Sequence, residues 1–264
     1  MTFRILIVTA VAAEADSVGL GLPSHGPGSG EVPLPGGFAL RRHTGPTPDP
    51  DGTPRTATVH PAADDLAVVA DVLVGGVGPA AVAAATATAL ASAAAPYDLV
   101  VSAGIAGGFA PAAPLGSVVV SDTLVAADLG AQTPDGYLDV EELGFGRSAH
   151  RAPEPLTRRI SAALAAGGQR HTVAPVLTVS TVTGTAARAA ELAGRHPDAA
   201  AEAMEGFGVA EAAAAYGVPV VEIRAVSNAV GPRDRAAWRI GEALDSLRNT
   251  FQLLSHSVFV EPAP

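Results

Sequence analysis

The stretch AEAMEGFGVAEAAAAYGVPVVEIRAVSNAVG, residues 201–231, contains the two local patterns that decide the fold. An alanine-rich run over 205–216 predicts a helix, and the apolar run over 218–228 predicts a buried strand. Polar residues occupy two positions at which a purely structural helix and strand would not require them. Glu205 stands at the start of the predicted helix, and Ser227 and Asn228 stand at the end of the predicted strand. A helix that leads into an almost continuously apolar strand is typical of a parallel sheet.

The same alternation of short apolar runs and alanine-rich runs continues along the chain. Further strands are predicted over 4–10, 71–78, 98–108, 116–122 and 173–183. Further helices are predicted from Pro79 to before Pro96 and over 154–166, 185–195 and 234–256. This order predicts a three-layer α/β/α fold with a mostly parallel central sheet.

Residues 19–63 interrupt this pattern, since they are rich in glycine and proline. They predict an irregular excursion with a hairpin formed by GFALRRH (37–43) and RTATVH (55–60). Neither an internal repeat nor a break in composition divides the chain. A single domain over residues 1–264 is therefore expected.

Composition narrows the class of partner. The formal net charge is −10 and no basic stretch offsets it, which argues against nucleic acid. Without cysteine there is no disulfide, thiolate nucleophile or cysteine metal site, and the seven histidines lack ligand spacing. The run over 80–95 lacks large side chains and predicts a buried helix rather than a membrane span. ILIVTAVAA (5–13) has features of a signal peptide, but a first strand is favoured, so a cytoplasmic protein is expected.

In a parallel sheet, ligands bind beyond the carboxyl ends of the strands, so the residues that end strands are the candidates. GGVGPAAVA (75–83) matches a dinucleotide fingerprint at Gly76, Gly78 and Ala81. The next strand, however, does not end in the acid that would hold a ribose, so no cofactor is predicted. SAGIAGG (102–108) would let the backbone approach a ligand closely, and the alternative is a simple tight turn.

Six stretches, taken in order, resemble the purine nucleoside phosphorylase superfamily and its nucleosidase branch. They are ILIVTAVAAEAD, GGVGPAAVAAA, VVSAGIAGGFAP, GSVVVSD, AMEGFGVA and VPVVEIRAVSN. Within the branch the sequence is most similar to the futalosine hydrolases of the alternative menaquinone pathway, which release hypoxanthine from futalosine. The resemblance implies a nucleoside phosphorylase-like fold, a small-molecule nucleoside substrate and a homodimer or higher homo-oligomer.

Asn228 carries the resemblance to futalosine hydrolase, because the adenine-cleaving enzymes have an aspartate at the matching place. An amide both donates and accepts hydrogen bonds. Its NH₂ can donate to O6 of a 6-oxopurine while its carbonyl accepts from a protonated N7. Asn228 therefore predicts a hypoxanthine-type or guanine-type base, and the alternative is an asparagine that only caps the turn.

By the same resemblance, two carboxylates have roles at the sugar. Glu205 would accept the ribose 2′-hydroxyl, with Met204 packing on the sugar, and Glu14 would activate water as general base. The alternatives are an acid favoured at a helix N-terminus for Glu205 and an ordinary surface acid for Glu14. Asp16 competes with Glu14, but the resemblance implies Glu14, because the family places its glutamate at this spacing from the first strand.

The remaining candidates support the substrate. An unpaired Arg224 inside an apolar strand would be costly, so a pair with Glu205 or Glu202 is expected, and the alternative is a salt bridge at the edge or rim of the sheet. The other substrate-binding candidates are Val77, Ile105, Ala106, Gly107, Val182, Thr183 and Ser227. Val182 stands where adenine enzymes usually carry a stacking aromatic.

Hydrolysis is favoured over phosphorolysis because the loop TAVAAEADSV (9–18) offers a glutamate, whereas the phosphorylases place an arginine there for phosphate. The alternatives are a 6-oxopurine nucleoside phosphorylase and a non-catalytic nucleoside-binding protein. Futalosine also bears an aromatic carboxylate on its 5′ side. Arg41, Arg42 or a residue from a partner subunit are the candidates to meet it.

Overall fold

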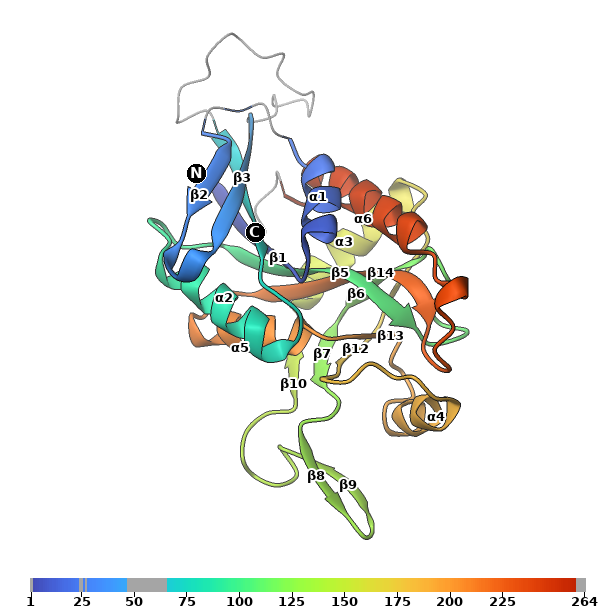
Figure 1. The fold of residues 1–264 in the computed structure, drawn as a ribbon. Coiled ribbons are helices and arrows are strands. Elements are labelled where there is room, and N and C mark those ends of the chain that lie inside the picture. Colours follow the sequence, from blue (N-terminus) through green and yellow to red (C-terminus); the bar gives the residue numbers. More distant parts are fainter. Residues whose placement is uncertain (1, 24–25, 27, 47–65, 260–264) are drawn as a thin grey trace.

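The structure is a computed structural model that describes residues 2–23, 26, 28–46 and 66–259. Its centre is formed by four parallel strands, β1 (Phe3–Thr9), β4 (Leu66–Val74), β5 (Leu99–Gly108) and β14 (Val220–Ala229). β5 pairs with both β1 and β14 (Figure 1). The carboxyl ends of the four strands therefore meet at one edge, where ligands bind in such sheets.

Shorter strands extend this sheet on both sides. β3 (Ala39–Pro46) and β2 (Gly30–Pro33) add an antiparallel edge beside β4. On the other side the order is β13 (Ala201–Ala203), β12 (Val176–Thr178), β7 (Thr123–Ala126) and β10 (Ala149–Arg151). β6 (Val118–Ser121) pairs antiparallel with β14, and β11 (His171–Val173) pairs with β6. The sheet is thus mixed but mostly parallel at its centre.

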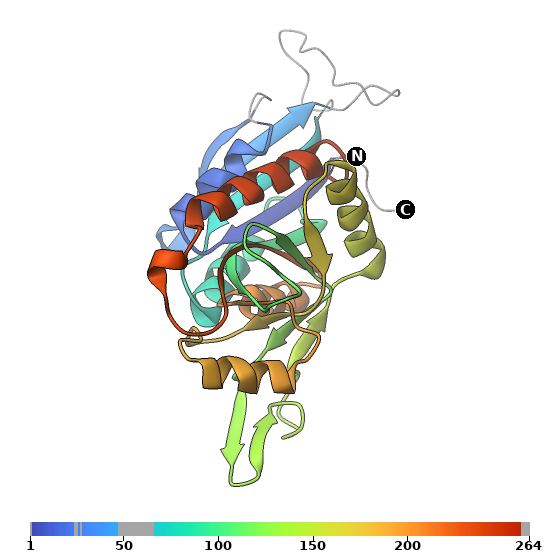
Figure 2. The same cartoon turned by 90° about the vertical axis from the view of Figure 1, so that its right-hand side faces the viewer.

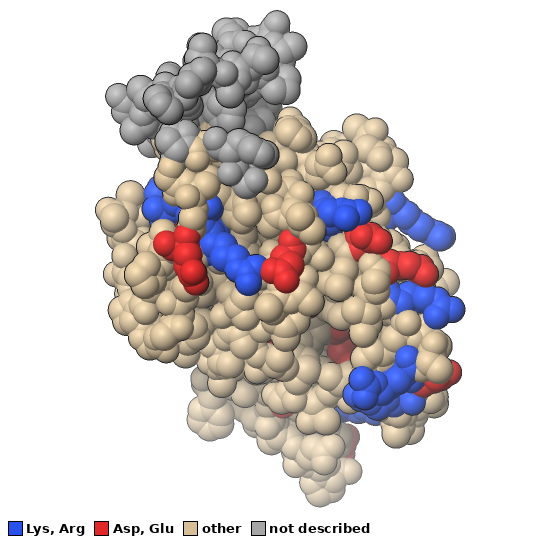
Figure 3. Space-filling model, turned by 45° about the horizontal axis from the view of Figure 1, so that its top comes forward, with Lys and Arg blue, Asp and Glu red and all other residues tan. Residues whose placement is uncertain are grey.

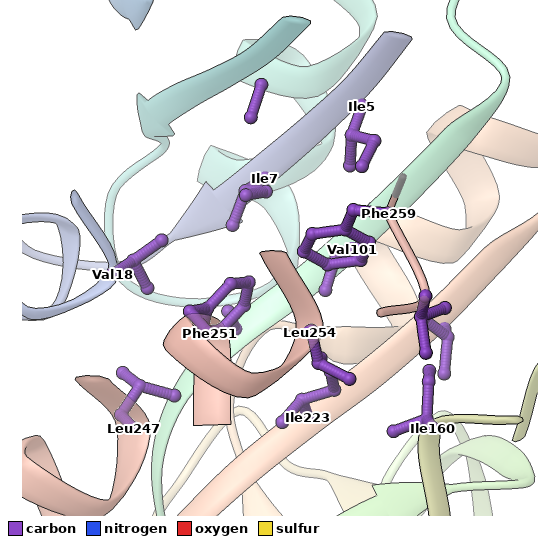
Figure 4. Packing of buried hydrophobic residues seen from close by; sticks show 14 of the residues in the cluster. Ile5, Ile7, Val18, Val101, Ile160, Ile223, Leu247, Phe251, Leu254 and Phe259 are labelled. Carbon is purple, nitrogen blue, oxygen red and sulfur yellow. The ribbon is translucent and has the colours of Figure 1, made fainter. Parts of the chain in front are cut away.

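Helices cover both faces of the sheet (Figures 1 and 2). On one face, α1 (Ala12–Leu20), α3 (Glu154–Ala166) and α6 (Ile240–Ser255) contribute Val18, Ile160, Leu247, Phe251 and Leu254 to the core shown in Figure 4. On the other face lie α2 (Pro79–Ala91) and α5 (Gly206–Ala215). The alternating residues of β1 explain the two cores, since Ile5 and Ile7 face the first and Leu6 and Val8 the second.

Small residues bring α2 and α5 close together. Both helices bury alanines, and a Cβ on Gly208 would stand against the backbone of Pro79. This close approach requires glycine at 208 and places the first turns of both helices beside the carboxyl ends of the strands. α4 (Ala186–Arg195) starts at Thr185, whose hydroxyl accepts from the Arg188 N–H at 3.2 Å, and buries Leu192 in a smaller cluster.

The three-layer fold predicted from the sequence is confirmed, and α3 spans the predicted 154–166. The strand predicted over 173–183 is wrong beyond Thr178. Pro175 separates β11 from β12, and after Thr178 the backbone N–H groups of Ser180 and Thr183 donate to the carboxylates of Asp128 and Glu202. Because these N–H groups bond to side chains, they do not take part in strand pairing, and the segment after Thr178 is a loop.

Two other predicted segments also differ. The helix predicted over 234–256 begins as a 3-10 turn, Arg235–Ala237, capped by Asp234, and α6 starts only at Ile240. Part of the predicted excursion is regular, because β3 pairs with β2 and with β4. Residues 55–60 lie outside the described residues. A hairpin of β8 (Gly130–Thr133) and β9 (Gly136–Asp139), absent from the prediction, projects from the molecule (Figure 1).

On the face shown in Figure 3, basic and acidic side chains alternate in a band, and several basic side chains lie together at the lower right. A continuous basic surface for a polyanion is not present on that face. Among the described residues, no helix is both long and apolar enough to cross a bilayer.

Candidate active site

A cavity of about 250 Å³ opens at the carboxyl ends of β1, β5 and β14, beside β13 and the start of α5. Ten of the twelve residues predicted from the sequence line it, namely Glu14, Val77, Ile105, Ala106, Gly107, Val182, Met204, Glu205, Ser227 and Asn228. They come from segments spread over the whole chain. The parallel arrangement of the strands brings them together.

Glu14 lies at the wall of the cavity in the first turn of α1. Its carboxylate accepts hydrogen bonds from the backbone N–H groups of Ala10 (3.0 Å), Val11 (3.3 Å) and Ile105 (2.8 Å). The side chain is only 4% exposed, and burial raises its pKa, although Arg224 and the N–H donors act in the opposite direction. A carboxylate that is fixed in place and made more basic has the properties of a general base.

Gly104 makes room for this carboxylate. A Cβ there would stand 2.5 Å from Glu14 Oε1 and 2.7 Å from Arg224 Nη1. No real Cβ approaches polar atoms so closely. The Gly-rich end of β5 therefore makes room for side chains from α1 and β14, which is more than a tight turn requires.

Arg224 lies behind the cavity and does not line it. It is 1% exposed, its Nη1 is 3.1 Å from Glu205 Oε2, and its Nε donates to Glu222 Oε1 at 2.8 Å. Burial lowers its pKa, but Glu222, Glu205 and Glu14 outweigh burial and raise it, so the guanidinium is charged. Of the two partners predicted for Arg224, Glu205 is the one it contacts.

Glu205 is the residue that precedes α5, so its side chain stands at the edge of the sheet and faces the cavity. Besides Arg224, it accepts from the N–H of Gly78 at 3.2 Å and from that of Met204 at 3.3 Å. Gly78 has a φ of 93°, which favours glycine. The turn with the dinucleotide fingerprint thus holds a carboxylate of the protein.

Asn228 stands at a β-bulge near the end of β14, where the pairing with β5 shifts between Val226 and Asn228. A bulge redirects side chains. The Ser227 hydroxyl donates to Asn228 Oδ1 at 2.9 Å, and Asn228 Nδ2 donates to the carbonyl of Ala229 at 3.0 Å. These bonds fix which end of the amide is the donor and leave one N–H and one lone pair available to a ligand.

Glu202 and Thr183 form a separate pair. The Thr183 backbone N–H donates to Glu202 Oε1 at 2.8 Å, and its hydroxyl donates to the other oxygen. Glu202 lines the cavity and burial raises its pKa, whereas Thr183 does not line the cavity. Thr183, which was predicted to contact the substrate, therefore lies outside the cavity lining, with its N–H and hydroxyl both engaged by Glu202.

Besides the apolar lining residues Ala10, Val11 and Ala203, sequence reasoning missed three residues of the site. Glu202 was considered only as a partner for Arg224, and Trp238 fell inside a predicted helix although it lines the cavity. Glu222 is fully buried beside Arg224, and its Oε2 has no hydrogen-bond partner among the described residues. An acid two positions from an arginine in an apolar strand was a usable signal, since residues i and i+2 share one face of a strand.

The two arginines proposed for the substrate carboxylate are already engaged. Arg42 binds the buried Asp71 through Nε (2.7 Å) and Nη2 (2.8 Å), and Arg41 pairs with Asp16. Neither lines the cavity. In the described residues, no group of three or more histidine, aspartate and glutamate side chains is arranged to hold a metal ion.

The cavity has a distinct chemical character. Asn228 provides an amide and Glu14, Glu202 and Glu205 provide carboxylates, while the remaining lining is apolar apart from Ser227. The cationic Arg224 is buried behind Glu205. This set can bind hydroxyl groups, stabilise positive charge on a sugar and activate water, and it presents no cation to an inorganic anion.

Comparison with known proteins agrees with this chemistry. A model of the phosphorylase superfamily matches residues 65–258. A futalosine hydrolase of Streptomyces coelicolor is 56% identical over 92% of this chain and 92% of its own length. A futalosine hydrolase of Acidothermus cellulolyticus is 44% identical over 96% of this chain and 91% of its own length.

Solved structures share the fold. The S-adenosylhomocysteine nucleosidase of Streptococcus pyogenes superposes with a TM-score of 0.76 at 16% identity, covering 99% of this chain and 98% of the other. A methylthioadenosine/S-adenosylhomocysteine nucleosidase of Colwellia psychrerythraea, solved with adenine, gives 0.72 at 19% identity over 97% and 96%. The chain therefore belongs to the phosphorylase superfamily and, within it, to the futalosine hydrolase family.

Proposed function

We propose that this protein hydrolyses the N-glycosidic bond of futalosine, releasing hypoxanthine and dehypoxanthine futalosine. The full-length relatives named futalosine hydrolase support the substrate. The observation that carries the reaction type is Glu14, a buried carboxylate held by three backbone N–H groups in a cavity whose lining offers no cation for phosphate.

In this proposal Glu14 takes a proton from water as the oxygen attacks C1′. The C1′–N9 bond breaks with its electron pair going to the purine, and the sugar passes through an oxocarbenium-like state. Positive charge develops only near that state, so the carboxylates of Glu14 and Glu205 stabilise it more than they stabilise the ground state. A positioned general base contributes about 10²- to 10⁴-fold.

Glu205 accepts the ribose 2′-hydroxyl and Met204 packs on the sugar. The ion pair with Arg224 and the N–H of Gly78 fix the Glu205 carboxylate for this contact. A side chain held by several bonds loses little entropy on binding, which is the advantage of a preorganised site.

Asn228 recognises the purine base through hydrogen bonds. Its free N–H donates to O6, and its carbonyl accepts from N7 after that nitrogen has taken a proton from solvent water, so the purine leaves as a neutral molecule. The bond from the Ser227 hydroxyl to Oδ1 supports this orientation of the amide. Val77, Ile105, Ala106, Gly107 and Val182 complete the walls around the base and sugar.

The test is an assay of purified protein with futalosine, with and without phosphate, followed by chromatography. The expected products are hypoxanthine and the free sugar at a rate independent of phosphate. A phosphorylated sugar formed only with phosphate would contradict hydrolysis and support the phosphorylase alternative. Binding without base release would indicate a nucleoside-binding protein.

The wider setting belongs to the same proposal. The reaction is a step of menaquinone biosynthesis in the cytoplasm, carried out by one catalytic domain in a homodimer or larger homo-oligomer. The name of the relatives supports the pathway. Analytical ultracentrifugation checks the oligomeric state, and a monomeric active enzyme would contradict that part of the proposal.

A further inference from the structure

The mouth of the cavity carries two arginines without acidic partners. Trp238 lines the cavity, and the guanidinium carbons of Arg233 and Arg235 lie 5.2 Å and 5.8 Å from the centre of its ring. Within the described residues neither guanidinium makes an ion pair, whereas the neighbouring Arg239 contacts Glu242. In a chain with a net charge of −10, two unpaired cations beside one site require an explanation.

Their position is fixed by backbone hydrogen bonds. The N–H of Arg239 donates to the carbonyl of Ser227 at 2.7 Å, and the N–H of Arg233 donates to that of Gly184 at 3.2 Å. The segment 233–239 is thus fastened to the strand end that carries Asn228 and to the loop that carries Val182. Trp238 and the two arginines therefore lie at the rim between these two walls.

The interior of the cavity cannot receive an anion. Its charged lining consists of Glu14, Glu202 and Glu205, and the nearest cation, Arg224, is buried and bound to carboxylates. A negatively charged group of a ligand must remain outside this lining to avoid repulsion. The rim beside Trp238 is the part of the site where an anion meets unpaired cations.

Arginine suits the binding of an anionic group at this rim better than lysine does. Its planar fork binds a carboxylate through two parallel hydrogen bonds, and its face stacks on an aromatic ring. The contacts with Trp238 restrict both guanidiniums before a ligand arrives. Asp234 lies between them in sequence, and its carboxylate accepts from the N–H of Ala236 at 3.1 Å and caps the turn. One carboxylate against two guanidiniums leaves the local charge positive.

We propose that Arg233 and Arg235 bind the carboxylate on the 5′ arm of the substrate and that Trp238 packs against the aromatic ring of that arm. This inference rests on the proposed function. With the base at Asn228 and the ribose at Glu205, the 5′ arm is the part of futalosine left to reach the rim. The arginines then select acidic nucleosides over neutral ones.

The experiment compares futalosine with its carboxylate methyl ester, which lacks the negative charge of the arm and carries one additional methyl group. With the unmodified enzyme, kcat/KM for the acid should exceed that for the ester about tenfold to hundredfold, mostly through KM, as expected for charge-assisted hydrogen bonds. In the double variant Arg233→Gln/Arg235→Gln this ratio should approach one. The ratio cancels any general loss of folded or active enzyme.

Arg248→Gln is the matched control, since it removes a cation that pairs with Asp245 on α6 and takes no part in the cavity. It should keep the preference for the acid. An unchanged acid-to-ester ratio in the double variant would overturn the inference while leaving the hydrolase proposal intact. Failure of the unmodified enzyme to release hypoxanthine from futalosine would instead overturn the proposed function.

Discussion

Arg224 Nη1 lies 3.1 Å from Glu205 Oε2, and this ion pair is almost completely shielded from water. It joins the last core strand to the start of α5 behind the cavity. Breaking a buried pair leaves an uncompensated charge and costs about 3–5 kcal/mol, so the pair keeps the Glu205 carboxylate in one position. The relationship explains why an arginine is tolerated in an otherwise apolar strand.

Glu14→Gln tests the general base. The amide keeps the size of the side chain but cannot take a proton from water, so kcat should fall about 10²- to 10⁴-fold while the melting temperature changes little. Steady-state kinetics and calorimetry measure the two effects. Asp16→Asn, an exposed acid two residues further along, should retain activity; equal losses in both variants would argue against a special role for Glu14.

Asn228→Asp tests the reading of the base. A carboxylate opposite O6 would replace a donor with a negative charge, so hypoxanthine release from futalosine should drop about tenfold or more, and preference should move toward a 6-amino analogue. A competition assay with both nucleosides measures this. Asn249→Asp on the exposed side of α6 is the control, and undiminished hypoxanthine release by Asn228→Asp would remove the residue from recognition.

Gly104→Ala tests the space shared by Glu14 and Arg224. The added Cβ would come within 2.5 Å of Glu14 Oε1, so the carboxylate or β5 must move. We expect a loss of about 1–3 kcal/mol in unfolding free energy together with a large loss of kcat. Gly194→Ala in α4, where a Cβ meets nothing within 4 Å, should be neutral or slightly stabilising. A fully active Gly104→Ala enzyme would contradict the packing described.

Glu222→Gln tests the protonation of the buried acid. Burial raises the pKa of Glu222 above its ordinary value of 4.5, against the opposing effect of Arg224. Between 4.5 and the raised value, the folded state holds a proton that the unfolded state has lost, so native stability falls as pH rises. Glutamine does not titrate. The melting temperature of the variant relative to the unmodified protein should therefore increase with pH above about 4.5.

The control for this comparison is Glu242→Gln, an exposed acid on α6. Its melting temperature relative to the unmodified protein should stay nearly constant over the same pH range. If the melting temperature of Glu222→Gln relative to the unmodified protein instead decreases as pH rises, the predicted pH dependence is contradicted. Glu222 would then be ionised and would stabilise Arg224 as a full ion pair.

The sequence by itself determined the layers of the fold and most of the cavity lining. Apolar strands and alanine-rich helices are local patterns, and the rule that parallel strands expose their carboxyl ends at one edge predicts which residues meet. Glu14, Glu205 and Asn228 were predicted from the resemblance to the nucleosidases, and the structure brings all three into the lining of one cavity.

Only the tertiary structure decided which partners these groups have. Glu14 accepts a hydrogen bond from the Ile105 N–H, 91 positions away. Arg224 pairs with Glu205 and Glu222, whereas Glu202 accepts a hydrogen bond from Thr183. Trp238 reaches the cavity because a 3-10 turn delays the start of α6. Such choices depend on distances between side chains of remote segments, and a local pattern carries no information about those distances.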